Sequence, residues 1–159
     1  MKTAMIIHSL TGNTLSVAER LKESFLGKGM ETDLIKIEPL GGEDRNETDP
    51  GKIRFQAYEN LDDYDYVIVG SPVRGFSMSP VLKSYLSHSE EMKKKKVLIF
   101  VTHFFPFSFM GGKSAISQVK KEVENKGGSV LDCAVIDWKN PAREKQIEKL
   151  IMKWSSTGK

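Results

Sequence analysis

The sequence has a single cysteine, Cys133, among 159 residues. An internal disulfide is therefore excluded, and such sparing use of cysteine is typical of proteins kept in a reducing compartment. We accordingly expect a cytoplasmic location. Cys133 lies in the apolar stretch SVLDCAVIDW, where a packed thiol is expected in preference to a reactive one.

Long apolar runs are also absent from the sequence. No run approaches the roughly 18–20 residues that are needed to span a bilayer. The first residues, MKTAMIIHSLTGN, contain one lysine and neither an apolar signal core nor a cleavage site. Neither membrane insertion nor a secretory signal is expected.

No excess of one charge is present either, because 24 basic residues face 21 acidic ones and the net charge is +3. This balance does not favour binding to nucleic acid. The run Lys93–Lys96 is interpreted as a solvated strand edge, with a polyanion site as the alternative. No histidines and acids have the spacing of metal ligands, so no metal site is expected.

The apolar content of 39% is enough for a proper core, and we expect one domain over residues 1–159. Short apolar, β-branched runs predict strands, and their continuous character is typical of parallel strands covered on both faces. The predicted strands are Thr3–Ile7, Leu34–Ile37, Tyr66–Val69, Val97–Val101 and Val130–Ile136.

Helical patterns separate most of these strands. Apolar stripes predict four helices. The first contains Val17, Leu21 and Phe25, and the second covers Val81–Leu86. The third contains Ile116, Val119 and Val123, and the fourth contains Ile147, Leu150, Ile151 and Trp154. The alternation predicts an α/β fold with one doubly wound, five-stranded parallel sheet and helices on both faces. In residues 38–60 we expect a long surface loop with one or two helical turns at Ile53–Tyr58.

The stretch HSLTGNT lies between the first predicted strand and the first predicted helix. In an open α/β sheet, ligands bind beyond the carboxyl ends of the strands, and a helix start attracts anions. Hydroxyl and amide donors, and a glycine that permits close backbone approach, come from Ser9, Thr11, Gly12, Asn13 and Thr14. We predict a site for a terminal phosphate; on this loop alone, a simple turn and helix cap remains the alternative.

Two familiar phosphate loops are absent. The dinucleotide fingerprint G-x-G-x-x-G needs three glycines, and only Gly12 is present here. The Walker motif needs a glycine six residues before its lysine, where the run ending in Lys113 has Phe107. An uncharged loop suits a phosphate that is held and never transferred, so nucleotide hydrolysis is not expected.

Two later loops follow the third and fourth predicted strands, at residues 70–80 and 102–112. The carboxyl ends of parallel strands meet at one edge of a sheet, so these loops should converge with the first. The later loop contains four of the eight phenylalanines within six residues. A flat heteroaromatic ring held between the two loops would cover them; the alternative is a lid packed on its own core.

With these three loops the sequence resembles the flavodoxin-like family over nearly its whole length. The stretch Ser9–Thr14 is similar to the family's phosphate loop S/T-x-T-G-N-T, and no long insertion interrupts the fifth strand, as in short-chain members. The resemblance implies the strand order 2-1-3-4-5 and FMN as the cofactor. It places the phosphate on Ser9, Thr11, Gly12, Asn13 and Thr14. It places the ring between Ser71, Pro72, Val73, Arg74, Gly75 and Phe76 on one side and Thr102, His103, Phe104, Phe105, Phe107, Phe109 and Gly111 on the other.

The sequence departs from the family at the second loop. Electron shuttles of the family commonly have tryptophan before its glycine and an acid after it, where this chain has Arg74 and Phe76. Arg74 beside the ring would favour the anionic reduced flavin; turned to water, it would not. His103 is either a donor to the flavin or a structural residue.

We expect an FMN-binding protein that carries electrons between redox partner proteins, without a catalytic residue of its own. An FMN-dependent NAD(P)H:acceptor oxidoreductase of the quinone type is the alternative, favoured by the apolar third loop and the lack of an acidic excess. A flavin-free interaction domain on the same fold is the third hypothesis.

Overall fold

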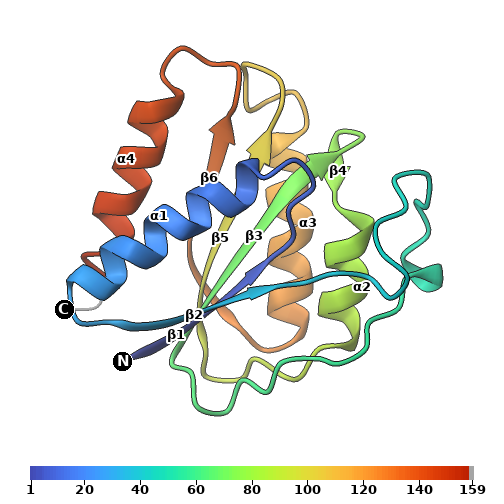
Figure 1. The fold of residues 1–159 in the computed structure, drawn as a ribbon, viewed down its shortest axis with the longest axis horizontal. Helices are drawn as coiled ribbons and strands as arrows, with labels where there is room; N and C mark the ends of the chain where they lie inside the picture. Colours follow the sequence, from blue (N-terminus) through green and yellow to red (C-terminus); the bar gives the residue numbers. More distant parts are fainter. Residues whose placement is uncertain (158–159) are drawn as a thin grey trace.

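The computed structural model describes residues 1–157, and Figure 1 shows their arrangement. The strands are β1 (Lys2–Ile7), β2 (Glu31–Lys36), β3 (Tyr66–Arg74), β4 (Ser77–Met78), β5 (Lys96–His103) and β6 (Ser129–Asp137). The helices are α1 (Asn13–Gly27), α2 (Pro80–His88), α3 (Gly112–Asn125), α4 (Arg143–Trp154) and the short 3₁₀ turn η1 (Pro50–Lys52). Among the residues described, no helix has the length and apolar character needed to cross a membrane.

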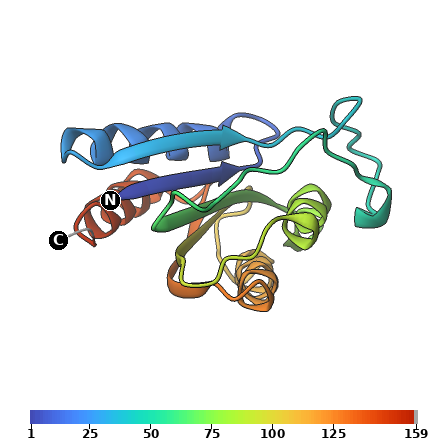
Figure 2. The same cartoon turned by 90° about the horizontal axis from the view of Figure 1, so that it is seen from below.

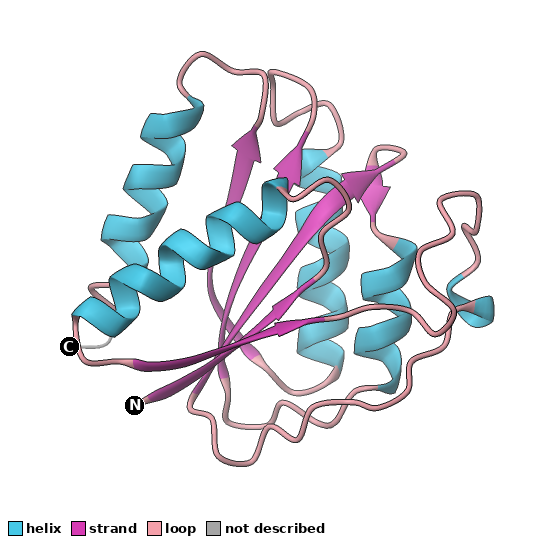
Figure 3. Cartoon of the chain, in the orientation of Figure 1, coloured by secondary structure: helices cyan, strands magenta, loops and turns pink. Residues whose placement is uncertain are grey.

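The long strands form a parallel sheet in the order β2-β1-β3-β5-β6 (Figure 3). Because β4 is an extra two-residue strand, this is the order 2-1-3-4-5 expected for the five main strands. The predicted fold class is therefore confirmed. The strand order reverses between β1 and β3, so the segments that follow these strands lie at the switch point where ligands bind.

The core has one layer on each face of the sheet. Figure 2 shows α1 and α4 on one side and α2 and α3 on the other. Phe25 of α1 and Trp154 of α4 pack in the first layer, and Leu82 of α2 and Val119 of α3 pack in the second. Strand side chains alternate between the layers, as Ile6 and Ile7 of β1 do.

The helices that border the site begin where local sequence directs them to begin. Ser79 caps α2, because its Oγ accepts a hydrogen bond from the Leu82 N–H at 3.4 Å and Pro80 occupies the first turn. Helices α1 and α3 each follow a glycine with positive φ, Gly12 at 91° and Gly111 at 103°. In each case the positive φ turns the chain sharply into the helix.

The prediction of helical turns at Ile53–Tyr58 is wrong. Within the described segment 38–60, the only helical turn is η1, which ends just before Ile53. Side chains of α2 bind the backbone there instead. The Ile53 carbonyl accepts a hydrogen bond from Ser84 Oγ at 2.8 Å, and the Glu59 N–H donates to Tyr85 Oη at 3.0 Å. The Phe55 ring meets the Tyr85 ring edge-on, which also holds the segment extended.

Candidate cofactor-binding site

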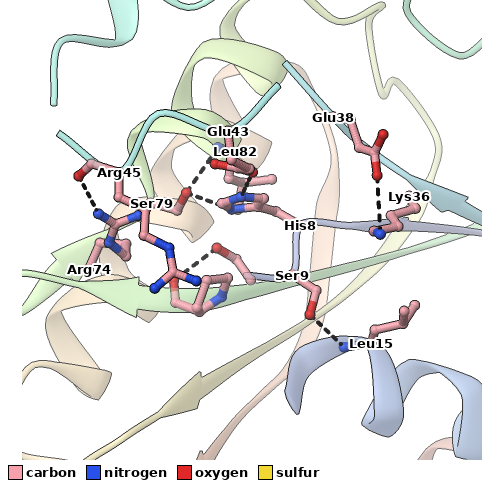
Figure 4. Close-up of polar contacts among 12 residues, drawn as sticks. His8, Ser9, Leu15, Lys36, Glu38, Glu43, Arg45, Arg74, Ser79 and Leu82 are labelled. Carbon is pink, nitrogen blue, oxygen red and sulfur yellow. Dashed lines mark hydrogen bonds and ion pairs between the residues drawn. The ribbon is translucent and has the colours of Figure 1, made fainter. Parts of the chain in front are cut away.

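The predicted phosphate loop joins β1 to α1 and presents unused backbone donors. Within residues 1–157, the N–H groups of Gly12, Asn13 and Thr14 have no acceptor. Ser9 Oγ accepts a hydrogen bond from the Leu15 N–H at 3.2 Å and so shapes the turn (Figure 4). A compact anion fits these free N–H groups at the positive end of α1.

Two threonines connect this loop to the far side of the site. Thr14 Oγ1 lies 2.7 Å from Thr102 Oγ1, and both side chains are buried. Thr14 therefore fixes the position of α1 against β5. Thr11 is exposed and Asn13 half-buried, so their polar side chains are accessible at the loop surface.

The second predicted loop is largely strand, which corrects its expected boundaries. Strand β3 continues through Arg74 and turns at Gly75 and Phe76 into β4, so that Arg74 pairs with Ser77. Ser71, Pro72 and Val73 thus lie in the strand, and Ser71 is buried. The parallel neighbour β5, paired as far as Pro72 with Thr102, keeps this part of the chain extended.

Arg74 extends toward the segment 38–60. Its Nη2 donates a hydrogen bond to the Arg45 carbonyl at 2.9 Å (Figure 4). The guanidinium is thus bound to protein, and its position relative to a flavin ring stays a prediction. Gly75, with φ of 52°, and Phe76, with φ of 63°, form the turn that follows.

The third segment displays most of the aromatic surface. Thr102 and His103 are the last residues of β5, and an irregular stretch then leads to Gly111 and α3. The exposed phenylalanines, between 38% and 74% accessible, are Phe76, Phe104, Phe105, Phe107 and Phe109. They do not form a lid packed on its own core. A planar heteroaromatic group fits this open apolar surface.

The second and third segments meet through aromatic rings and a glycine. The Phe76 and Phe105 rings are stacked, with centroids 5.5 Å apart and planes within 7°. A Cβ atom on Gly111 would lie 2.5 Å from the Cα of Phe76, so only glycine permits this approach. The predicted ring-binding segments are therefore adjacent, as the resemblance requires.

A buried histidine beside the predicted phosphate loop forms hydrogen bonds with partners that are distant in the sequence and not local to it. His8 Nε2 lies 2.6 Å from Glu43 Oε1, and His8 Nδ1 lies 2.8 Å from Ser79 Oγ (Figure 4). Burial lowers the pKa of His8, and the Glu43 carboxylate partly offsets that effect. Ser79 was recognisable as a helix cap, but no local signal identified Glu43 as the partner of His8.

These features fit FMN: free N–H groups suit its phosphate, and the aromatic segments suit its ring. When bound, FMN supplies one- and two-electron redox chemistry. The residues of the chain would hold the phosphate at Gly12–Thr14 and shield the ring with phenylalanines. His103 is buried, and its two ring nitrogens face Met110 O and Asp137 Oδ1. The structural alternative for His103 is thereby favoured over donation to the flavin.

A protein-family model described as NADPH-dependent FMN reductase matches residues 1–138. The chain belongs to this family. A curated relative from Archaeoglobus fulgidus, an NAD(P)H dehydrogenase (quinone), is 26% identical over 126 residues, which cover 70% of this chain and 64% of the relative. The match thus spans slightly less than two thirds of that relative.

Solved structures with the same fold include several flavodoxins. Oxidised flavodoxin 1 from Bacillus cereus aligns with a TM-score of 0.68 and 17% identity, over 98% of this chain and 95% of that one. A protein of known structure from Bacteroides eggerthii aligns with a TM-score of 0.69 and 19% identity, over 96% and 94% of the two chains. The flavodoxin-like resemblance is confirmed, and the family and fold both support FMN as the cofactor. The individual contact residues stay predictions.

Proposed function

We propose that this family member is an FMN-dependent oxidoreductase that accepts electrons from NAD(P)H and passes them to a small planar acceptor such as a quinone. The observation that carries the proposal is a basic groove beside the β3–β4 turn. The groove has a volume of about 480 Å³ and includes Arg74, Gly75 and Lys83 in its lining.

The groove has the charge that a pyridine nucleotide requires. Its described lining residues include two cations, Arg74 and Lys83, and no acidic side chain. It also includes Pro80, the first residue of α2, where the helix dipole is positive. The pyrophosphate of a pyridine nucleotide is an anion of matching charge. Gly75 lies both in this groove and in the segment expected beside the flavin, so a nucleotide bound here would be close to the cofactor.

The family description and the curated relative also support an NAD(P)H-linked activity. The exposed phenylalanines form an apolar surface at the same edge of the sheet, and this surface suits a small acceptor. We also propose a cytoplasmic location, because the sequence contains a single cysteine.

Electron transfer between redox partner proteins is the second candidate. Its support is the alignment with flavodoxins along 98% of this chain, together with the acidic segment Glu43–Asp49 as a docking region. The flavin-free interaction domain has lost its support, because family and fold both favour FMN.

Anaerobic mixing of the yellow holoprotein with NADPH or NADH tests the proposal. We expect direct bleaching of the flavin absorbance without an added reductase. In Lys83→Ala, the apparent affinity for the nucleotide should fall about tenfold, as for the loss of one hydrogen bond to a charged group. Lys145→Ala, an exposed lysine on α4, is the matched control and should behave as wild type. Bleaching that needs an added reductase would instead identify the carrier.

A further inference from the structure

Two loops at the carboxyl edge of the sheet form one continuous surface. Residues 104–113 follow β5 and enter α3, and residues 138–143 follow β6 and enter α4. Lys139 Nζ lies 4.2 Å from the centroid of the Phe104 ring, and Asn140 Nδ2 donates a hydrogen bond at 3.0 Å to a carbonyl of the first loop. The two loops therefore lie side by side (Figure 1), and we call them the aromatic basic surface.

The apolar part of this surface extends beyond the place predicted for the flavin ring. Phe105 stacks on Phe76 at the junction with the β3–β4 turn, where the ring is expected. Phe107 and Phe109 stack on each other instead, with centroids 5.5 Å apart, and are 53% and 74% exposed. Among the described residues, this second pair has no aromatic contact with the first. The second pair thus offers apolar area to a further partner.

The charged residues of the aromatic basic surface are all basic. The two loops contain Lys113, Lys139 and Arg143, and no aspartate or glutamate. Both lysines are exposed. Two acids flank the second loop, but the one that ends β6 is buried, and the carboxylate of Glu144 lies 3.0 Å from the Arg20 guanidinium. The exposed rings are therefore bordered by cations.

Acidic residues gather at the other end of the same edge. The segment 38–60 follows β2 and contains six acidic and three basic residues. Because β2 and β6 are the outer strands of the sheet, this segment and the aromatic basic surface come from opposite ends of the strand order (Figure 1). An anionic partner therefore attracts one end of the edge and repels the other, which sets the orientation of docking.

An anionic lipid bilayer matches both properties of the aromatic basic surface. Aromatic side chains favour the region between the headgroups and the acyl chains, and adjacent lysines are attracted by the negative potential of a cytoplasmic leaflet. A second copy of the chain is a poorer match. A two-fold contact through this surface would bring Lys113 and Lys139 close to the same lysines of the other copy.

We propose that the aromatic basic surface docks on the anionic headgroups of a lipid bilayer, with Phe107 and Phe109 entering the interface and the lysines over the headgroups. This docking is peripheral and requires no spanning helix. The acceptor is then an apolar quinone dissolved in that bilayer. Each turnover oxidises one NAD(P)H and, with one proton from water, reduces one quinone to its quinol. The choice of acceptor rests on the proposed function, whereas the docking does not.

Co-sedimentation of the holoprotein with lipid vesicles tests the docking. We expect binding to phosphatidylcholine vesicles that contain about 30% phosphatidylglycerol, and binding about tenfold weaker or less to phosphatidylcholine alone. Raising the NaCl concentration from about 0.1 M to about 0.5 M should weaken binding to the anionic vesicles, because salt screens the lysines. Absence of binding to either vesicle, or equal binding to both, would overturn the proposal.

Charge reversals test which part of the molecule docks. Lys113→Glu/Lys139→Glu should bind the anionic vesicles about tenfold more weakly, or less, since each lysine near such a surface contributes about fivefold. Lys93→Glu/Lys94→Glu makes the same change of net charge at exposed residues before β5, at the amino edge of the sheet. This control should stay within about twofold of the wild type. Equal losses in the two double variants would show that net charge alone drives binding and would refute the assigned surface.

Phe109→Ser tests the apolar contact at constant charge. Its affinity for the anionic vesicles should fall about fivefold or more, because less apolar area enters the interface. Leu26→Ser, which changes an exposed residue near the end of α1, is the matched control and should bind as the wild type. Since Phe109 also belongs to the predicted flavin wall, the flavin content of each preparation is measured by absorbance. Wild-type apoprotein is the reference for a variant that loses flavin, and undiminished binding would contradict the proposal.

Turnover with NADPH tests the source of the acceptor. For an apolar quinone embedded in the anionic vesicles, kcat/KM should be about tenfold lower in Lys113→Glu/Lys139→Glu, and for a short water-soluble quinone it should be unchanged. Equal rates with the embedded quinone would refute the bilayer as the source. Vesicle binding without NADPH oxidation would support the docking and refute the proposed oxidoreductase. Sedimentation velocity completes the test, because self-association that Phe109→Ser abolishes, without vesicle binding, would assign the surface to a second copy.

Discussion

At the scale of single residues, His8 connects three parts of the chain that are distant in sequence. It follows β1, contacts Glu43 of the segment 38–60 through Nε2, and contacts Ser79 at the start of α2 through Nδ1. A neutral ring with its proton on Nε2 satisfies both contacts, since the Ser79 hydroxyl donates to Nδ1 and Glu43 accepts. His8 also directly precedes the predicted phosphate loop.

Acid should destabilise the protein through this residue. Burial places the pKa of folded His8 below the ordinary value of 6.5, so below that pH the unfolded chain binds a proton that the folded chain does not. The free energy of unfolding therefore falls as the pH drops below about 6.5. Urea denaturation at a series of pH values measures this decline.

The His8→Gln variant should show a shallower decline, although it is less stable at neutral pH. His88→Gln, which alters an exposed histidine, serves as its control and should keep the full decline. If His8→Gln and wild type decline in parallel, the acid sensitivity comes from other groups.

At the scale of elements, the site depends on how closely the β3–β4 turn approaches the start of α3. Gly111 has φ of 103°, and a Cβ there would meet the backbone of Phe76. Both the turn conformation and the steric contact therefore select glycine. The stacked Phe76 and Phe105 rings lie at the same junction.

Gly111→Ala should lower the free energy of unfolding by about 2–4 kcal/mol, from backbone strain and overpacking together. Gly29→Ala is a matched control, because Gly29 has φ of 75° but open space around its Cα. It should lose only the strain, about 1–2 kcal/mol. Urea denaturation measures both variants, and equal losses would show that the turn moves away from the new methyl group without cost.

The segment 38–60 illustrates why some elements were not predictable. Its apolar residues at Ile53–Tyr58 have helical spacing, but the backbone there is bound by Ser84 and Tyr85 of α2. Tertiary hydrogen bonds replaced local ones, and no short-range pattern reveals such partners. The hairpin after β3 was missed for a related reason, since pairing with β5 and β4 extends the strand through Arg74.

At the scale of the whole molecule, α4 completes the layer shared with α1. The family model ends at residue 138, before this helix. Trp154 is nevertheless 1% exposed and packs edge-on against Phe100 of the central sheet, while its Nε1 donates to Asp132 at 2.7 Å. The last helix is therefore part of the core.

Trp154→Ala should lower the free energy of unfolding by about 3–5 kcal/mol, because it leaves a cavity and removes the indole N–H that donates to Asp132. Met152→Ala changes a residue of the same helix that is 70% exposed, and its effect should stay within about 0.5 kcal/mol. Urea unfolding of both variants gives the comparison. Similar small losses would mean that α4 contributes little to the core.

The amino-acid sequence by itself determined the fold class and, through its resemblance, the strand order, and it predicts the phosphate loop at Ser9–Thr14. Such features rest on local patterns, because apolar runs, helix caps and a Gly-containing turn act within a few residues. Only the tertiary structure decided which buried polar groups meet. Glu43 reaches His8 across 35 positions, and Asp137 reaches His103 from a neighbouring strand. Such contacts follow from strand register and loop path, which short-range patterns do not encode.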